Sequence, residues 1–216
     1  MTRTIPILPA TLFIYLSCCA VHAEDQPADT ATNAAPAKDA TAHENPAEKT
    51  AKPPHKVELV KGKLTLNVPS EWQLVKPRSK IIQHEFAIPA PKKELAAGRM
   101  TITVAGGGIE ANIARWVGQF QSADGKPLGK DAKRVEVKKV GGLNFHLVDL
   151  QGDFQDKPRG PFGPSVNRPG YRMLAAIVPT EKDGTWFIKF YGPQETVTAG
   201  KKPFDTIFKE LKWQAE

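Results

Sequence analysis

The sequence predicts an α+β domain in which helices cover a mainly antiparallel sheet. Apolar residues recur at every second position in most segments after residue 57, as they do in half-buried strands. Only two segments show the spacing of an amphipathic helix. The strand segments also follow one another through short turns, which join antiparallel neighbours but are too short for parallel crossovers.

The 216 residues divide by composition into three parts. Residues 1–23 have the features of a signal peptide: Arg3, an apolar run over residues 5–16 and the small-x-small site Val21-His22-Ala23. Residues 24–56 are Ala, Pro, Thr and charged residues that cannot bury a core, so they predict a disordered linker. Residues 57–216 are expected to form a single globular domain, which excludes multi-domain enzymes and polytopic membrane proteins.

Cys18 and Cys19 are the only cysteines of the chain. Cleavage after Ala23 would leave no thiol, disulfide or cysteine metal site. Two alternatives stay open: an uncleaved anchor, although the run is short of the roughly 20 residues that span a bilayer, and a lipoprotein modified at one of the cysteines. We expect an exported protein, periplasmic or extracellular, with no membrane span after cleavage.

The predicted domain is basic. Residues 57–216 hold 25 Lys or Arg against 17 Asp or Glu, a net charge near +8. A basic surface favours anionic partners. For an exported protein these are an acidic polysaccharide, a wall polymer, lipid headgroups or an acidic protein, whereas nucleic acid is a poor candidate. The alternative is that the charge only confers solubility.

Period-two patterns place the strands. One of them, residues 143–154, buries odd positions at Leu143, Phe145 and Leu147 and even positions from Val148 onward, so we expect a bulge near 147–148. The predicted strands cover residues 64–68, 82–88, 99–104, 135–137, 143–154, 171–178 and 186–190, and the last two should pair as a hairpin.

Helical spacing predicts one helix after the third strand and one at the end of the chain. The first has a single apolar stripe with Glu110 in its first turn, where an acidic residue is favourable. The second opens at Pro203 and ends near Trp213. The stripes comprise Ile109, Ile113, Trp116, Val117 and Phe120 in the first helix, and Phe204, Ile207, Phe208 and Leu211 in the second.

The order of these elements over residues 64–213 resembles the PsbP-like fold, shared by the extrinsic P subunit of photosystem II and the Ran-binding Mog proteins. The resemblance rests on the opening Leu64-Thr65-Leu66-Asn67-Val68-Pro69-Ser70-Glu71-Trp72, the helix after the third strand, the consecutive hairpins and the closing helix. It implies an α/β/α sandwich, as in small exported bacterial proteins of unknown function. Function does not follow from the fold: the acidic face of the Mog proteins is absent here, and no motif supports a photosynthetic partner.

A long surface loop is expected over residues 157–170, because prolines and glycines interrupt every turn of it. Guanidinium groups beside an aromatic ring on a loop suit anionic or planar ligands. The candidate binding residues are therefore Lys157, Arg159, Phe162, Arg168 and the flanking Arg172. A solvated hairpin connection is the alternative.

Catalytic motifs are absent: the sequence has no nucleophile elbow, phosphate-binding loop or dinucleotide fingerprint, and no histidine pair with metal-ligand spacing. His84 is expected to face inward as a core histidine. Asp149 and Asp153 lie roughly 13 Å apart along a strand, farther than the paired carboxylates of glycosidases.

We therefore predict an exported, non-catalytic binding or structural module at the bacterial cell envelope, with no cofactor and no metal. Its partner would be an anionic envelope polymer or an acidic protein. The alternative is an extracytoplasmic hydrolase that uses His84 or the region of Asp149 and Asp153.

Overall fold

A computed structural model describes residues 52–158, 163–180 and 182–214. The expected signal peptide 1–23 and all but the last residues of the expected linker lie outside these ranges, as do Arg159 and Phe162. Strand β1 (His55–Leu59) takes in His55, which we had assigned to the linker. The reason is a specific contact: the His55 ring packs 5.7 Å from that of Phe86, and its backbone pairs opposite Val68.

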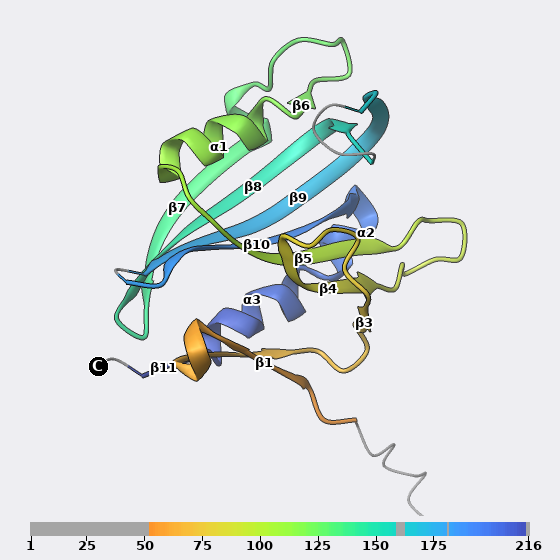
Figure 1. Cartoon of the computed structure of the whole chain (residues 1–216). Helices are drawn as coiled ribbons and strands as arrows, with labels where there is room; N and C mark the ends of the chain where they lie inside the picture. The colour runs from red at the N-terminus through yellow and green to blue at the C-terminus, as the bar shows by residue number, and fades with distance from the viewer. Residues whose placement is uncertain (1–51, 159–162, 181, 215–216) are drawn as a thin grey trace, which may run out of the picture. The chain divides into compact units, whose positions relative to one another are not determined.

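The described strands form a large sheet and a small one, both antiparallel throughout (Figure 1). The predicted α+β class with a mainly antiparallel sheet is confirmed. The large sheet has eight strands in the order β3-β4-β5-β10-β9-β8-β6, with β7 also paired to β8. Its strands are β3 (Gln73–Val75), β4 (Ile82–Ile88), β5 (Gly98–Ala105), β6 (Phe120–Gln121), β7 (Lys133–Val140), β8 (Leu143–Asp156), β9 (Val166–Thr180) and β10 (Gly184–Pro193).

The small sheet is an element that the sequence did not predict. It joins β1, β2 (Leu64–Val68) and β11 (Lys212–Trp213), and the short 3-10 helix η1 (Val60–Gly62) connects its first two strands. The apolar residues of β2 are fully buried. The helices of the described part are α1 (Ile109–Val117), α2 (Gln194–Ala199), α3 (Lys201–Lys209) and the short 3-10 helix η2 (Lys130–Ala132).

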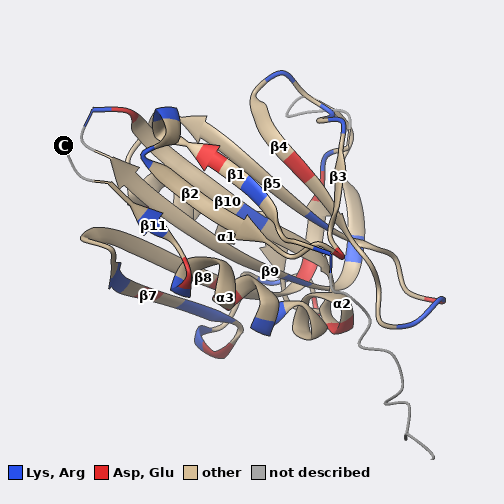
Figure 2. Cartoon of the chain, turned by 90° about the horizontal axis from the view of Figure 1, so that it is seen from below, with Lys and Arg blue, Asp and Glu red and all other residues tan. Residues whose placement is uncertain are grey.

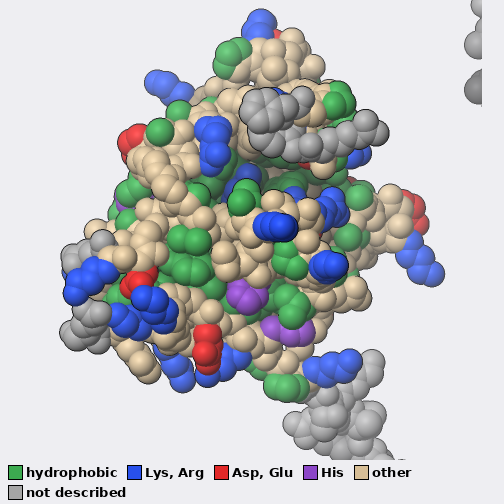
Figure 3. Space-filling view, viewed as in Figure 1, with side chains coloured by type: hydrophobic (Ala, Val, Ile, Leu, Met, Phe, Trp, Pro, Cys, Tyr) green, Lys and Arg blue, Asp and Glu red, His purple; other side chains and the backbone are tan. Residues whose placement is uncertain are grey.

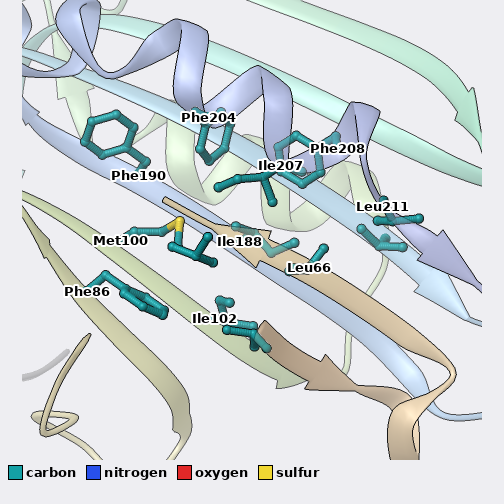
Figure 4. Packing of buried hydrophobic residues seen from close by; sticks show 14 of the residues in the cluster. Leu66, Phe86, Met100, Ile102, Ile188, Phe190, Phe204, Ile207, Phe208 and Leu211 are labelled. Atoms are coloured by element: carbon teal, nitrogen blue, oxygen red, sulfur yellow. The ribbon is translucent and has the colours of Figure 1, made fainter. Parts of the chain in front are cut away.

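One hydrophobic core lies between the large sheet, the small sheet and α3 (Figure 4). Phe204, Ile207 and Phe208 point from α3 toward the strands, and the ring of Phe208 meets that of Phe145 edge-on at 5.6 Å. The predicted closing helix is thus present. It begins at Lys201, shortly after the end of α2, and ends at Lys209, so the predicted end near Trp213 is wrong: Leu211 lies beyond the helix, and Trp213 lies in β11.

A second core lies on the opposite face of the large sheet, under α1. Trp116 is only 2% exposed, and its ring meets that of Phe187 edge-on at 5.8 Å. Phe120, which we expected on the helix stripe, lies beyond the end of α1 in β6, where it packs 5.0 Å from Phe154. The predicted helix and its burial against the sheet are otherwise as expected.

The two cores explain why β8 changes its buried face. Phe145 belongs to the core under α3, whereas Val148 and Leu150 belong to the core under α1. Both faces of the strand are covered, so no bulge is needed at 147–148, and that prediction is wrong. The register shift against β9 occurs instead between Gly152 and Phe154.

The expected loop 157–170 is also shorter than predicted. Residues from Val166 onward are already in β9, and Asn167 and Arg168 pair with Gln155 and Phe154. Proline and glycine are tolerated there because β8 and β9 extend at this end beyond most of the sheet, where few neighbours require a continuous ladder. The last five residues of the expected loop, 166–170, therefore belong to β9.

Candidate functional site

Helix α1 covers only part of its face of the large sheet (Figure 1). Farther across this face, the strand register sets Lys189 of β10 opposite Thr101 of β5, which in turn lies opposite Glu85 of β4. The next row pairs Tyr191 with Arg99. Because directly paired residues present their side chains on the same face, these polar groups form one cluster. We call it the Lys189 site: Glu85, Arg99, Trp116, Lys189 and Tyr191.

Lys189 lies between two aromatic rings. Its Nζ is 5.2 Å from the ring centre of Trp116 and 5.5 Å from that of Tyr191, distances at which a ring face attracts a cation. The side chain is partly exposed. Within residues 52–158, 163–180 and 182–214, no carboxylate forms an ion pair with this ammonium.

The surroundings of Lys189 disfavour its charge. Burial lowers its pKa to about 8, and the positive charges of Arg115 and Arg99 act in the same direction, against a smaller opposing effect of Asp156. Burial likewise raises the pKa of Tyr191, so this phenol is neutral at physiological pH. The site therefore holds a cation that an approaching anion would stabilise.

Beside Lys189, Arg99 is fixed by a buried carboxylate. Glu85 is 1% exposed, and its two oxygens accept from Arg99 Nε at 2.7 Å and from Nη2 at 3.0 Å. The backbone N–H of Arg78 donates a further bond of 3.0 Å to Glu85, and Arg99 Nη1 donates to the Tyr191 hydroxyl. Burial alone would raise the pKa of Glu85, but the bonds from Arg99 and Arg78 lower it. The Glu85 carboxylate is thus bonded to two arginines and does not act as the counter-ion of Lys189.

The structure does not gather the predicted binding residues into one surface. Arg172 is 9% exposed and forms a bidentate pair with Asp149, at 2.9 Å from Nε and 2.6 Å from Nη2, while Nη1 donates to Thr198. It therefore faces α2, on the side of the sheet opposite to Lys189. Arg168 lies in β9, with its Nε 3.5 Å from Asp156. Lys157 is exposed beyond the end of β8.

A cavity of about 140 Å³ between β7, β8 and α3 lies over the Arg172 side of the sheet. Its charged lining residues are paired: Asp149 with Arg172, Lys201 with Asp205 at 2.6 Å, and Glu136 with the two basic residues beside it on β7. The ion pairs leave little charge to recruit a ligand, so we do not place the site there.

The residues considered for hydrolysis, His84, Asp149 and Asp153, are partly buried in the fold or held by bonds within it. His84 is half-buried, and burial lowers its pKa. Asp149 is held by Arg172, and Asp153 accepts the backbone N–H of Gly170 at 3.1 Å. No group of three or more His, Cys, Asp and Glu suited to a metal ion occurs among the described residues. In the same part of the chain, no helix combines the length and apolar character that a membrane span requires.

Sequence reasoning missed the Lys189 site, although a signal for it exists. Residues 186–190 are apolar on both faces of the strand except at Lys189. Phe187 and Tyr191, two positions away on either side, share its face. A single lysine in a strand that is apolar on both faces is the feature that could have indicated it.

No family model matches the chain, and no curated protein matches it. Several solved structures are similar in fold, among them these three. The PsbP protein of the cyanobacterium Synechocystis (CyanoP) has a TM-score of 0.46 at 11% identity, over 75% of this chain and 93% of that one. LpqN, involved in cell envelope biogenesis of Mycobacterium tuberculosis, has 0.43 at 9%, over 77% and 88%. A protein of unknown function from Pseudomonas aeruginosa has 0.41 at 11%, over 76% and 100%. At these identities and TM-scores the similarity is one of overall fold only.

Proposed function

We propose that the chain is an exported, non-catalytic binding module of the bacterial cell envelope that binds an anionic group of its partner at Lys189. The observation that supports this most directly is the position of the Lys189 ammonium, between two rings and without a carboxylate partner in the described part of the chain. Its surroundings destabilise the charge, and such perturbed groups are concentrated at functional sites.

The partner in this proposal presents a carboxylate or a phosphate. One of its oxygens accepts a hydrogen bond from Lys189 Nζ, which gains the counter-ion that it lacks in the unbound protein. Arg99 keeps the Glu85 carboxylate bonded, because its guanidinium is held by Glu85 and Tyr191, so the ligand's anion is the counter-ion that Lys189 gains. An acidic envelope polymer or an acidic protein carries such groups, and the excess of basic residues in the domain attracts either one over a longer range.

The location of the protein in this proposal rests on the sequence. Residues 1–23 direct export, and residues 24–54 separate the signal from the domain, which begins with β1 at His55. Mass spectrometry of the exported protein should find Glu24 at its N-terminus. A lipid-modified Cys18 or Cys19 at the N-terminus would make it a lipoprotein instead.

Binding to anionic polymers tests the proposed site. We would titrate the purified protein with polygalacturonate, which carries carboxylates, and with polyphosphate, using neutral dextran as the control polymer. A charge-assisted hydrogen bond contributes about 1.5–3 kcal/mol, so Lys189→Met should weaken binding to the preferred polymer about tenfold or more.

The matched control is Lys93→Met, which removes the same charge from an exposed loop position. It should weaken binding less than about twofold, because an exposed charge acts only through the screened field of the whole protein. Equal losses in the two variants would mean that net charge alone governs binding. Failure of the wild-type protein to bind either polymer would contradict the proposed function.

A further inference from the structure

The turn between β3 and β4, residues 76–81, and the strand β3 before it expose aliphatic side chains. Ile81 is 70% exposed and Leu74 is 57% exposed, although large aliphatic residues normally lie in the core. Between them lie Lys76, Arg78 and Lys80, all on the surface. Residues 73–84 contain no Asp or Glu. The turn thus combines exposed apolar groups with positive charges and has no negative charge among them.

The turn stands out from the large sheet. Figure 2 shows it projecting beyond β3 and β4 with Lys and Arg on it. In the space-filling view, Lys and Arg side chains gather among apolar ones over this region, near the centre of the picture (Figure 3). A projecting turn can reach a flat surface that the rest of the domain does not touch.

Interactions within the protein hold the turn in this shape. The Arg78 backbone N–H donates to the buried Glu85 at 3.0 Å, and Arg78 Nε lies 3.3 Å from the same carboxylate. The N–H of Ile82 donates to the carbonyl of Ser79 at 3.1 Å. Because the base of the turn is tied to Glu85, Leu74 and Ile81 are displayed at a fixed place.

We propose that the β3–β4 turn docks the protein on a bilayer surface that contains anionic phospholipids. Ile81 and Leu74 enter the headgroup region, and Lys76 and Lys80 lie at lipid phosphates. Apolar side chains ringed by basic ones are the composition that binds such interfaces. This inference rests on the proposed envelope location, since a bilayer must be present, but not on ligand binding at Lys189.

A membrane surface fits the turn better than a protein partner does. Two exposed aliphatic side chains, Ile81 on the turn and Leu74 on β3, provide far less apolar area than the roughly 800 Å² per partner of a stable protein interface. A bilayer needs no complementary groove, and its anionic headgroups supply the negative charge that residues 73–84 lack.

Vesicle co-sedimentation of the purified protein tests the proposal. Vesicles of phosphatidylglycerol mixed with phosphatidylcholine should bind the protein, and vesicles of phosphatidylcholine alone should bind it at least tenfold more weakly. Each basic residue near an anionic surface contributes about fivefold in affinity, so the double change Lys76→Gln and Lys80→Gln should weaken binding about 25-fold. Ile81→Ser should weaken it at least threefold without changing the net charge.

Matched controls separate docking from general charge and from folding. The changes Lys93→Gln and Lys130→Gln remove the same charge from exposed positions elsewhere, and Val137→Ser removes an aliphatic group that is 60% exposed on β7. All should bind the vesicles within twofold of the wild type. Circular dichroism melting should show that every variant is folded, which is expected because the replaced side chains are exposed.

Several outcomes would overturn the proposal. These are equal binding to both kinds of vesicle, wild-type affinity of Ile81→Ser, or equal losses in the turn and control variants. Self-association that Ile81→Ser abolishes, without any vesicle binding, would assign the turn to a protein interface. The Lys189→Met variant should bind vesicles as the wild type does, and Ile81→Ser should still bind the anionic polymer, so the two proposals fail separately.

Discussion

Replacing Lys189 with methionine should make the protein more stable while it weakens anion binding. Methionine fills the space of the lysine stem without its charge, so the contacts with Trp116 and Tyr191 are largely kept. A residue whose removal stabilises a fold is retained for function rather than for folding. The Lys189→Met variant therefore separates the two roles.

The magnitude follows from the lowered pKa of Lys189. A decrease from 10.5 to about 8 corresponds to at most about 3–4 kcal/mol of destabilisation of the charged form in the folded protein. Contacts with the two ring faces stabilise the charged ammonium by about 0.5–1 kcal/mol each. The partial exposure of the side chain reduces the cost of its charge further. We expect the variant to be more stable than the wild type by about 1–2 kcal/mol at pH 7.

The difference in stability between Lys189→Met and the wild type should change with pH in one direction. The unfolded wild-type chain holds the Lys189 proton up to about pH 10.5, whereas the folded chain releases it near pH 8. The unfolded state therefore binds more protons between these values, and the free energy of unfolding contributed by this residue rises with pH. The advantage of Lys189→Met should shrink as the pH rises from 7 toward 10.

Urea unfolding followed by circular dichroism measures this difference at each pH, with Lys93→Met as the control for loss of an exposed charge. The control should change the free energy of unfolding by less than about 0.5 kcal/mol. A Lys189→Met variant that is less stable than the wild type at pH 7, or whose difference from the wild type does not change with pH, would refute the reasoning about the lysine environment.

Three further variants test contacts inside the fold, two of them at the Lys189 site. Trp116→Ala should lower the free energy of unfolding by about 3–5 kcal/mol, and a melting temperature equal to that of the wild type would show that α1 is misplaced. Glu85→Gln should cost about 3–5 kcal/mol because it leaves the Arg99 charge partly buried and unpaired. In the wild type, the stability from this pair is present above pH 4.5 and is lost as the pH falls through the lowered pKa of Glu85. An unchanged acid limb of the stability profile in Glu85→Gln would argue against the pair. Gly152→Ala should cost on the order of 1–3 kcal/mol or more, because Gly152 has a φ of +153° and an added Cβ would lie 2.4 Å from the carbonyl oxygen of Gln121. Unfolding midpoints in urea that match the wild type would contradict this.

Local patterns were sufficient for most strands and for both main helices. Local spacing alone predicts which side chains are buried in residues 99–104 and in the stripe from Ile109 to Val117. The residues that they contact need not be known for this prediction. The hairpin of β9 and β10 followed from two apolar runs joined by a short turn. These are features in which local propensity and burial agree.

The remainder depended on contacts between distant segments. An alternating pattern assumes one covered face, so the change from odd to even buried positions in β8 predicts a bulge. The strand is instead covered on both faces, by α1 on one and α3 on the other. The pairing of Arg172 with Asp149 joins residues 23 positions apart, and it turned a predicted ligand contact into an internal ion pair. The surroundings of Lys189 come from α1 and β5, which lie far from it in the sequence, so no local pattern predicts them.

Proton uptake on binding tests the central claim most directly. An anion that reaches Lys189 must raise its pKa from about 8, so binding near pH 8.5 should draw a proton from the buffer. Titration calorimetry of polygalacturonate or polyphosphate in buffers of different ionisation enthalpy measures this uptake. We predict a substantial fraction of a proton per bound site in the wild type and in Lys93→Met, and almost none in Lys189→Met. Equal uptake in all three proteins, or no uptake in the wild type, would contradict anion binding at Lys189.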